Sequence, residues 1–282
     1  MRWINRAALL AVLGVIGIAF AGLAGAALAA VPEPWQLGLQ PAASPVQERI
    51  TGLHDLLLVI ITTITIFVFV LLVYTIWRFR ASRNPAPTRT AHNTMIEVVW
   101  TVVPVLILVV IAFPSFKLLY FQDRAEDAEM TIKVVGHQWY WSYEYPDYGD
   151  VKFDSYMLQP EDLKPEQKRL LEVDNRLVVP AGTNVRVLVA GSDVIHSWFV
   201  PSLGVQIYAM PGRLNETWMN VEKPGIYYGQ CNQICGVNHA YMPIAVEALP
   251  KEEFARWLEE AKKKFATAPA SSPVSVAANV AR

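Results

Sequence analysis

Two long apolar stretches in the first half of this chain limit what it can fold into. Residues 56–76 contain no charged side chain and consist mainly of Leu, Val, Ile and Phe, and a second apolar run covers residues 98–116. A helix needs about 20 apolar residues to cross the hydrocarbon core of a bilayer. We therefore expect a hairpin of two transmembrane helices, with Trp77 at a membrane interface. Pro104 and Pro114 are expected to kink the second helix.

The short loop between these stretches carries positive charge only. It has no acidic residue before Glu97, but it contains the arginines Arg78, Arg80, Arg83 and Arg89. Loops rich in Lys and Arg lie on the cytoplasmic side of membranes. We therefore expect a protein of the bacterial inner (plasma) membrane whose large C-terminal domain lies in the periplasm.

Residues 1–30 have the features of an export signal. Arg2 and Arg6 form a positive start, an apolar run follows, and small residues at 27–30 precede Pro32. This order is typical of a signal peptide that is cleaved after small residues. The alternative is an uncleaved membrane anchor, because the apolar run is long enough to span the bilayer.

Residues 122–250 consist of short runs of Val, Ile, Tyr and Trp separated by turn residues, such as Pro-Ala-Gly at 180–182 and Lys-Pro-Gly at 223–225. Closely spaced short strands predict an all-β sandwich or Greek-key barrel. A helical pattern follows at 251–266. The Ala/Ser/Pro/Val-rich tail at 267–282 is expected to be disordered.

The length and composition of the chain agree with this division. Its 282 residues, 53% of them hydrophobic and 17% charged, suffice for a membrane part and one globular domain. We expect five segments: a signal peptide at 1–30, an N-terminal segment with the transmembrane hairpin at 31–121, an extracytoplasmic domain at 122–250, a helix at 251–266 and a tail at 267–282.

The extracytoplasmic part has an excess of acidic residues. Residues 122–266 hold 21 acidic and 15 basic side chains, a net charge of −6. Two interpretations remain open, an ordinary solubilising surface and an acidic field that steers a basic partner. The chain shows no nucleic-acid-binding motif and no basic patch interleaved with aromatic residues, so we expect no nucleic-acid partner.

The only two cysteines of the chain, Cys231 and Cys235, are followed closely by His239 and Met242, and His196 lies upstream between strand-like segments. A disulfide is one interpretation, because the periplasm is oxidising, and a zinc site is another. One cysteine with two histidines and a methionine would describe a mononuclear blue-copper site. The second cysteine permits a second metal ion, with both thiolates bridging.

Across residues 45–265 the chain resembles subunit II of the cytochrome c oxidases, the haem-copper respiratory oxidases, in its alphaproteobacterial and mitochondrial form. The resemblance is carried by the motifs HNTMIEVVWTVVP, GHQWYWSYEY, DVIHSWFVPSLGV, PGRLNETW and YYGQCNQICGVNHAYMPI. It implies a two-helix transmembrane hairpin followed by a cupredoxin domain with the binuclear copper centre CuA. The ligand positions are occupied by His196, Cys231, Cys235, His239, Met242 and the backbone carbonyl of Gln233.

Gln233 departs from the family, which usually has glutamate at this position. In the family this glutamate helps to bind a magnesium ion shared with subunit I. A backbone ligand survives the change, but a neutral amide is a poorer ligand for a hard cation than a carboxylate. We therefore expect the copper site to persist and the shared magnesium site to be weakened.

The resemblance assigns roles to two further residues, each of which has a plainer explanation. Trp139 would be the exposed residue through which an electron enters from cytochrome c, although aromatic residues in a strand most often serve the core. Glu97 would mark the entrance of a proton pathway into subunit I, although a carboxylate at a membrane surface can also simply anchor a helix.

The implied function is the electron-transfer subunit of a cytochrome c oxidase, with oxidase subunits I and III and cytochrome c as partners. A quinol oxidase subunit shares the fold but lacks copper ligands, and nitrous oxide reductase is a soluble enzyme with a propeller domain. A fourth interpretation is a membrane adaptor whose two cysteines form a disulfide and that does not transfer electrons.

Overall fold

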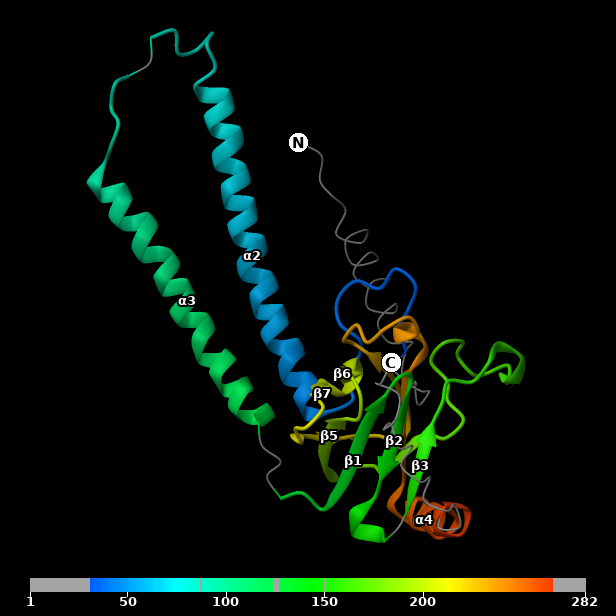
Figure 1. The fold of residues 1–282 in the computed structure, drawn as a ribbon. Coiled ribbons are helices and arrows are strands. Elements are labelled where there is room, and N and C mark those ends of the chain that lie inside the picture. Colours follow the sequence, from blue (N-terminus) through cyan, green and yellow to red (C-terminus); the bar gives the residue numbers. More distant parts are fainter. Residues whose placement is uncertain (1–30, 87, 124–126, 150, 266–282) are drawn as a thin grey trace, which may run out of the picture.

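The structure, a computed structural model, describes residues 31–86, 88–123, 127–149 and 151–265. The expected signal peptide and the tail at 267–282 lie outside the described residues. Figure 1 shows a long helical hairpin that extends from one end of a β-domain. The helices are α2 (Pro45–Arg78), α3 (Thr94–Asp123) and α4 (Lys251–Phe265), and the short 3-10 helices are η1 (Pro146–Tyr148), η2 (Pro160–Asp162), η3 (Pro201–Leu203) and η4 (His239–Tyr241).

Helices α2 and α3 contain the two predicted apolar stretches and extend beyond them at both ends. Both are long and apolar enough to cross a membrane. Most of their large apolar side chains are exposed, Phe67 and Leu108 for example to 61% and 65%. The predicted hairpin is confirmed, and the protein is anchored in a membrane with a separate C-terminal domain.

Threonine side chains inside α2 satisfy their polar groups within the helix. The hydroxyls of Thr63 and Thr65 donate hydrogen bonds to the carbonyls of Val59 and Ile61, each at 2.8 Å. A bond of this kind leaves no hydroxyl donor facing lipid. The threonines are therefore compatible with a transmembrane helix.

The β-domain is a sandwich of two five-stranded sheets, as the sequence pattern predicts. One sheet has the order β3-β2-β1-β5-β8 and the other the order β4-β10-β9-β6-β7. The pairs β1–β5 and β4–β10 are parallel and the remaining pairs are antiparallel. The strands are β1 (Met130–His137), β2 (Tyr140–Glu144), β3 (Lys152–Ser155), β4 (Leu177–Pro180), β5 (Asn184–Gly191), β6 (His196–Val200), β7 (Val205–Ala209), β8 (Asn215–Asn220), β9 (Gly225–Cys231) and β10 (Pro243–Leu249).

Alternating side chains of the strands build the core between the two sheets. In β1 and β5, which pair in parallel, every second residue is buried. Side chains of a strand point alternately to its two faces, so this pattern directs one face of the sheet into the core. Trp141 and Trp198, both fully buried, fill the space between the sheets.

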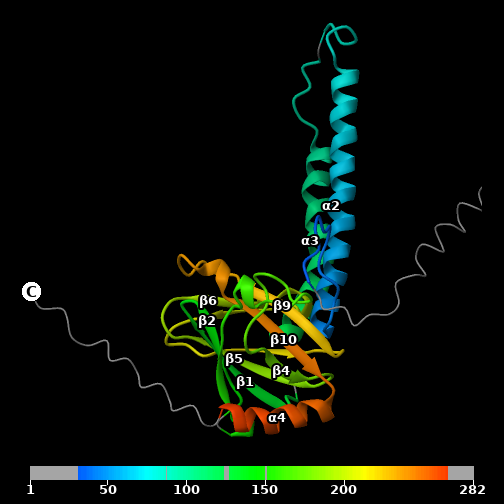
Figure 2. The ribbon, with the colours of Figure 1, turned by 90° about the vertical axis from the view of Figure 1, so that its right-hand side faces the viewer.

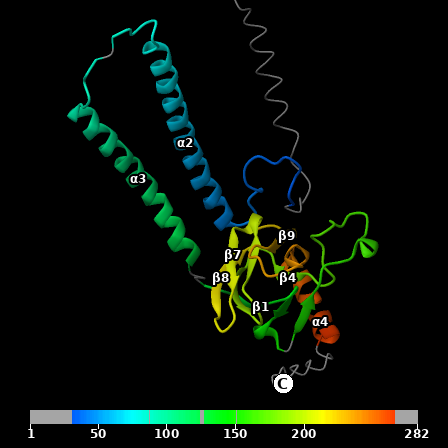
Figure 3. The ribbon, with the colours of Figure 1, turned by 45° about the horizontal axis from the view of Figure 1, so that its top comes forward.

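The base of the hairpin is fixed to the β-domain through both helices. Ser44 caps α2 by accepting a hydrogen bond from the amide of Gln47, and its hydroxyl donates to the carbonyl of Leu203 at 2.7 Å. The indole of Trp218 donates to the carbonyl of Phe121 near the end of α3. Figure 3 shows β7 and β8 close to this end of the hairpin.

Helix α4 closes the end of the β-domain that lies farthest from the hairpin, as Figure 2 shows. Phe254 and Leu258 are buried, and Trp257 packs against Tyr145 with ring centroids 5.5 Å apart. The helix lies where the sequence pattern predicts one, and its buried side chains share one face.

A buried ion pair fixes the segment before β4 to the outer face of its sheet. Arg176 donates two hydrogen bonds to the carboxylate of Glu172, at 2.8 and 2.9 Å, and one to Glu247 at 3.3 Å. The hydroxyl of Tyr228 donates to Glu172 at 2.7 Å. Burial raises the pKa of Glu172, but the hydrogen bonds from Arg176 and Tyr228 outweigh it and hold this pKa below its ordinary value.

Replacing Arg176 by methionine should therefore destabilise the β-domain by about 3–5 kcal/mol, because it leaves a buried carboxylate without its partner. Thermal unfolding of the purified chain in detergent, followed by circular dichroism, measures the loss. Arg186→Met is the control, since Arg186 and its partner Glu216 form an exposed pair. Equal melting temperatures for the two variants would contradict the assignment.

The pH dependence follows from the same ion pair. A carboxylate with a lowered native pKa stabilises the fold above its unfolded pKa of about 4.3 and loses this contribution as the pH falls through the native pKa. The difference in stability between the parent and Arg176→Met should thus be largest near neutral pH and shrink under acid conditions.

Candidate metal centre

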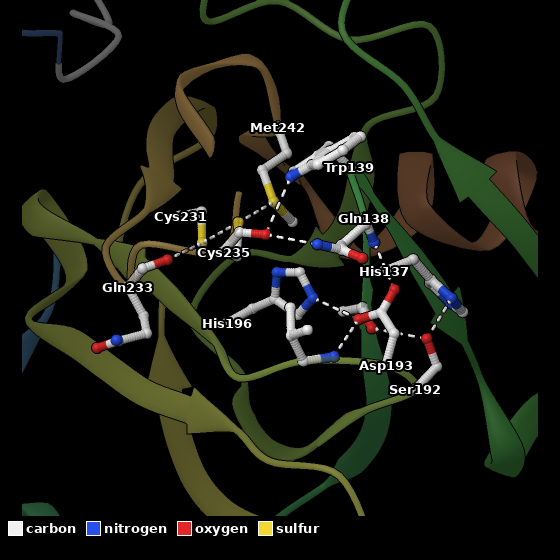
Figure 4. Close-up of polar contacts among 12 residues, drawn as sticks. His137, Gln138, Trp139, Ser192, Asp193, His196, Cys231, Gln233, Cys235 and Met242 are labelled. Carbon is white, nitrogen blue, oxygen red and sulfur yellow. Dashed lines mark hydrogen bonds and ion pairs between the residues drawn. The ribbon is translucent and has the colours of Figure 1, made fainter. Parts of the chain in front are cut away.

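The predicted ligand residues meet at one end of the β-domain, between β6, β9 and β10 (Figure 4). His196 is the first residue of β6 and Cys231 the last residue of β9, and these two strands pair with Trp198 opposite Cys231. Strand β9 also pairs antiparallel with β10, with Pro243 opposite Gln230. The loop between β9 and β10 must therefore return Met242, which precedes Pro243, to the side of Cys231.

The two cysteines are buried and free, with their Sγ atoms 3.9 Å apart. A disulfide needs an S–S distance of about 2.05 Å, so the cysteines do not form one here. The ligand atoms of His196, Cys231 and Cys235 all lie within 4.8 Å of one another. The Sγ atom of Cys235 also lies 3.6 Å from Nδ1 of His239 and 3.6 Å from Sδ of Met242.

Gln233 contributes its backbone and not its side chain to this group. The Sγ atom of Cys231 lies 3.3 Å from the carbonyl oxygen of Gln233. In Figure 4 this carbonyl faces Cys231, while the side-chain amide points away from the two sulfurs. The backbone oxygen is thus available as a ligand.

Asp193 sets the orientation of the His196 ring. The Nε2 atom of His196 lies 2.8 Å from Oδ1 of Asp193, whereas its Nδ1 atom is buried and has no partner among the described residues. A carboxylate on one ring nitrogen fixes the proton there and leaves the other nitrogen free to bind a metal. Asp193 is a site residue that the sequence analysis missed. Its position three residues before His196 is the signal that could have found it.

The walls of the site require close packing. A Cβ atom at Gly136 would lie 2.9 Å from Cδ2 of His196, so this position accommodates the ring only without a side chain. The indole of Trp141 donates to the carbonyl of Met242 at 3.2 Å and is fully buried. Close packing therefore holds His196 and Met242 in place at the edge of the core.

Trp139 lies directly on the ligand loop. Its indole Nε1 donates to the carbonyl of Cys235 at 3.2 Å, and the side-chain amide of Gln138 donates to the same oxygen at 2.7 Å. A Cβ atom at Gly236, where φ is +125°, would lie 2.8 Å from the Trp139 ring. The half-buried Trp139 is therefore in contact with the backbone of a predicted ligand.

The thiols differ in how readily they ionise. Burial raises the pKa of Cys231, but the neighbouring ring of His196 and backbone groups of Ser197 and Gln233 outweigh it and leave the pKa below its ordinary value. Burial and the neighbouring Cys231 raise the pKa of Cys235. Cys231 is therefore the thiol that first becomes a thiolate, which is the form that binds metals.

These residues fit a copper centre. Two thiols, two imidazoles and a thioether are soft or intermediate donors, which favour copper over magnesium, calcium or manganese. Metal–sulfur bonds are about 2.3 Å long, so two sulfurs 3.9 Å apart can both bind the same ion. The buried Nδ1 of His196, which has no hydrogen-bond partner among the described residues, is also suited to bind a metal. A magnesium ion is not supported in the same way, because the carbonyl of Gln233 faces the sulfurs and its side chain is a neutral amide.

Glu97 lies far along the chain from this site, in the first turn of α3. Its carboxylate accepts a hydrogen bond from the amide of Asn93 at 3.4 Å, and the Asn93 side chain accepts one from the amide of Ile96 at 3.3 Å. This reciprocal pattern resembles a capping box, with the acidic side chain at the fourth helical position instead of the third. The sequence analysis missed this local role, although Asn93 and Glu97 have the residue types that such a cap needs.

Comparisons with known proteins find matches for both parts of the chain. The family model described as the periplasmic domain of cytochrome c oxidase subunit II matches residues 130–249, and the model of its transmembrane domain matches residues 32–118. A protein of Rickettsia bellii named probable cytochrome c oxidase subunit 2 is 54% identical over 83% of this chain and 87% of its own length.

Similar relatives occur in plants and among solved structures. Cytochrome c oxidase subunit 2 of Oenothera berteroana is 50% identical over 82% of this chain and 92% of its own length. The crystallised periplasmic domain of subunit II of the cytochrome oxidase of Bradyrhizobium japonicum is 52% identical, covering 50% of this chain and 99% of that domain with a TM-score of 0.47. From the two matching family models and the relatives in Rickettsia bellii and Oenothera berteroana, the chain belongs to the cytochrome c oxidase subunit II family.

Proposed function

We propose that this chain receives electrons from reduced cytochrome c at a binuclear copper centre in the periplasm. It passes them to haem in subunit I, where oxygen is reduced and protons are pumped. Subunits I and III are its partners in the membrane. The observation that carries this proposal is the meeting of two free thiols, two histidines and Met242 beside the indole of Trp139.

The ligands of the copper pair are His196, Cys231, Cys235, His239, Met242 and the carbonyl of Gln233. A copper pair held by these residues would supply one-electron transfer. The protein would provide fixed surroundings that keep the change in geometry small. Asp193 holds the ring of His196, and Trp141 holds the backbone of Met242.

Replacing Met242 by leucine should leave two copper ions bound per chain, because the thioether is the weakest ligand of the set. The reduction potential should shift by an amount on the order of tens of millivolts, and oxidase activity should fall. Metal analysis, electron paramagnetic resonance and potentiometry test this.

Met219→Leu is the control, since Met219 is fully buried in the core and belongs to β8. It should change neither the potential nor the spectrum. A parent protein with one copper ion per chain, or with a Cys231–Cys235 disulfide in its metal-loaded form, would refute the binuclear centre.

The route by which the electron enters is proposed to be Trp139. Its indole donates a hydrogen bond to the carbonyl of Cys235, which joins the ring to a ligand residue through a single contact. Acidic groups lie close by. Asp193 accepts a hydrogen bond from the amide of Gln138 at 2.7 Å, and Asp154 accepts one from Ser142, whose hydroxyl also contacts His137. Together with the net charge of −6 over residues 122–266, they favour docking of a basic partner.

Replacing Trp139 by leucine should slow the reduction of copper by cytochrome c by at least about tenfold, a rise in the barrier of about 1.4 kcal/mol. The dissociation constant should change much less, because the substitution leaves the acidic groups in place. Stopped-flow kinetics and binding measurements on the same variant separate the two effects.

Trp257→Leu, a change on α4 at the far end of the domain, is the control. Raising the ionic strength should weaken association equally in the parent and both variants. A normal rate of copper reduction in Trp139→Leu would show that the electron enters elsewhere.

Glu97 is proposed to collect protons at the cytoplasmic side for a pathway into subunit I. Its carboxylate also caps α3, so a loss of function could come from either role. Glutamine can make the same capping hydrogen bond as glutamate but cannot titrate. The variant Glu97→Gln therefore keeps the cap and removes only the proton-carrying group.

Glu97→Gln should lower steady-state oxygen reduction several-fold, while reduction of copper by cytochrome c stays near normal. The complementary control is Asn93→Ala, which removes the other half of the cap and retains the carboxylate. It should cost helix stability of about 1 kcal/mol without the same loss of turnover. Normal turnover in an assembled Glu97→Gln oxidase would leave Glu97 with its capping role alone.

A further inference from the structure

A short turn before α2, residues 33–39, exposes large apolar side chains on the membrane-facing side of the β-domain. Trp35 and Leu37 are exposed to 98% and 97%, and Leu39 is exposed to 41%. The metal site and the copper proposal do not use these residues. We call residues 33–39 the N-terminal turn.

The N-terminal turn is held in shape by its own hydrogen bonds. The side-chain oxygen of Gln36 accepts from the amide of Glu33 at 3.3 Å, and its side-chain nitrogen donates to the carbonyl of Leu39 at 3.0 Å. The amide of Gln36 donates to the carbonyl of Glu33 at 3.2 Å. Gln36 thus forms hydrogen bonds with backbone groups at both ends of the turn, while the apolar side chains are exposed.

Both ends of the turn are attached to the β-domain. On one side Val31 packs against a small buried cluster that includes Tyr228 and Ala245. On the other side the amide of Ala43 donates to the carbonyl of Ser202 at 2.9 Å. The turn is therefore a loop with fixed ends and an apolar tip.

The tip projects along the direction of the transmembrane helices. Figures 1, 2 and 3 all show this segment, in dark blue, rising from the β-domain toward the level of the middle of α2. Helix α2 begins at Pro45, and its uncharged part begins at Leu56, 11 residues later. At 1.5 Å per residue, Leu56 lies about 16 Å along the helix from Pro45. The boundary between water and hydrocarbon is expected near Leu56, so a turn that rises to the level of Leu56 reaches this boundary.

We propose that the N-terminal turn inserts Trp35 and Leu37 into the periplasmic interface of the lipid bilayer. Tryptophan is enriched at the level of lipid headgroups, because its ring is apolar and its N–H group is polar. Apolar side chains on an ordered element at this depth add buried area to a membrane contact. Since α2 already fixes the chain in the membrane, lipid is within reach of the turn without any further partner.

The insertion would give the β-domain a second membrane contact, apart from the base of the hairpin. The turn carries one charge, that of Glu33, and its remaining residues are neutral. Lipid therefore suits this surface better than a charged protein partner does. The other occupants to be tested are a neighbouring oxidase subunit and a second copy of this chain.

Photocrosslinking in native membranes tests the proposal. A benzophenone amino acid replaces Leu37 in the full chain within the assembled oxidase, and the same amino acid replaces Arg256 on α4 in a control chain. Arg256 is also exposed, but α4 lies at the end of the domain away from the spans. After irradiation, mass spectrometry identifies what is attached to each position.

The expected result is a mass shift of one phospholipid on the peptide that contains position 37, and no such shift at position 256. Adding Gln36→Ala to the labelled chain should lower the yield of the lipid adduct, because it removes the hydrogen bonds that order the turn. A crosslink from position 37 to another subunit or to a second copy would overturn the proposal, and so would the absence of any adduct.

Discussion

The pairing of β9 with both β6 and β10 is the constraint on which the metal centre depends. The register that sets Trp198 opposite Cys231 places the first residue of β6 beside the last residue of β9. The antiparallel register with β10 places Met242 next to Cys231, although the two residues are 11 positions apart in the sequence. A slip of one residue in either pair would turn alternate side chains to the other face and separate the ligands. The hydrogen bonds between these strands thus determine where the predicted metal ligands lie.

A single carbonyl links the two parts of the site. The oxygen of Cys235 accepts from the indole of Trp139 and from the amide of Gln138, while the backbone amide of Gln138 donates to Asp193 at 2.7 Å. Asp193 in turn holds His196. The turn between β1 and β2 that carries Trp139 and the loop that carries Cys235 are therefore one hydrogen-bonded unit. Such a unit resists movement, and a site with fixed surroundings keeps reorganisation small when charge changes.

The sequence predicted the parts of this protein whose signals are local. The two apolar stretches, the helix α4 and the spacing of Cys231, Cys235 and Met242 can each be recognised within a short window. Gly136 could not be recognised in this way, because its role comes from a contact with His196 across the sandwich. Asp193 lies only three residues before His196, but its second contact, with the amide of Gln138, joins residues 55 positions apart. Helix α2 also begins before its apolar stretch, at the cap formed by Ser44, and the hydroxyl of Ser44 bonds to Leu203, 159 positions away. The periodicity of apolar residues along the sequence indicates which side chains are buried. It does not indicate hydrogen bonds between residues that are far apart in the sequence.

The bond between Ser44 and Leu203 also bears on the order of assembly. Ser44 is synthesised long before Leu203, and α2 is complete before any strand of the β-domain exists. The helix must therefore enter the bilayer with only the local half of its cap, the bond to Gln47. Folding of the sandwich afterwards supplies the second half and, through Trp218 and Phe121, the contact with α3. The hairpin is therefore formed first, and the β-domain makes its hydrogen bonds to the hairpin once its own strands have paired.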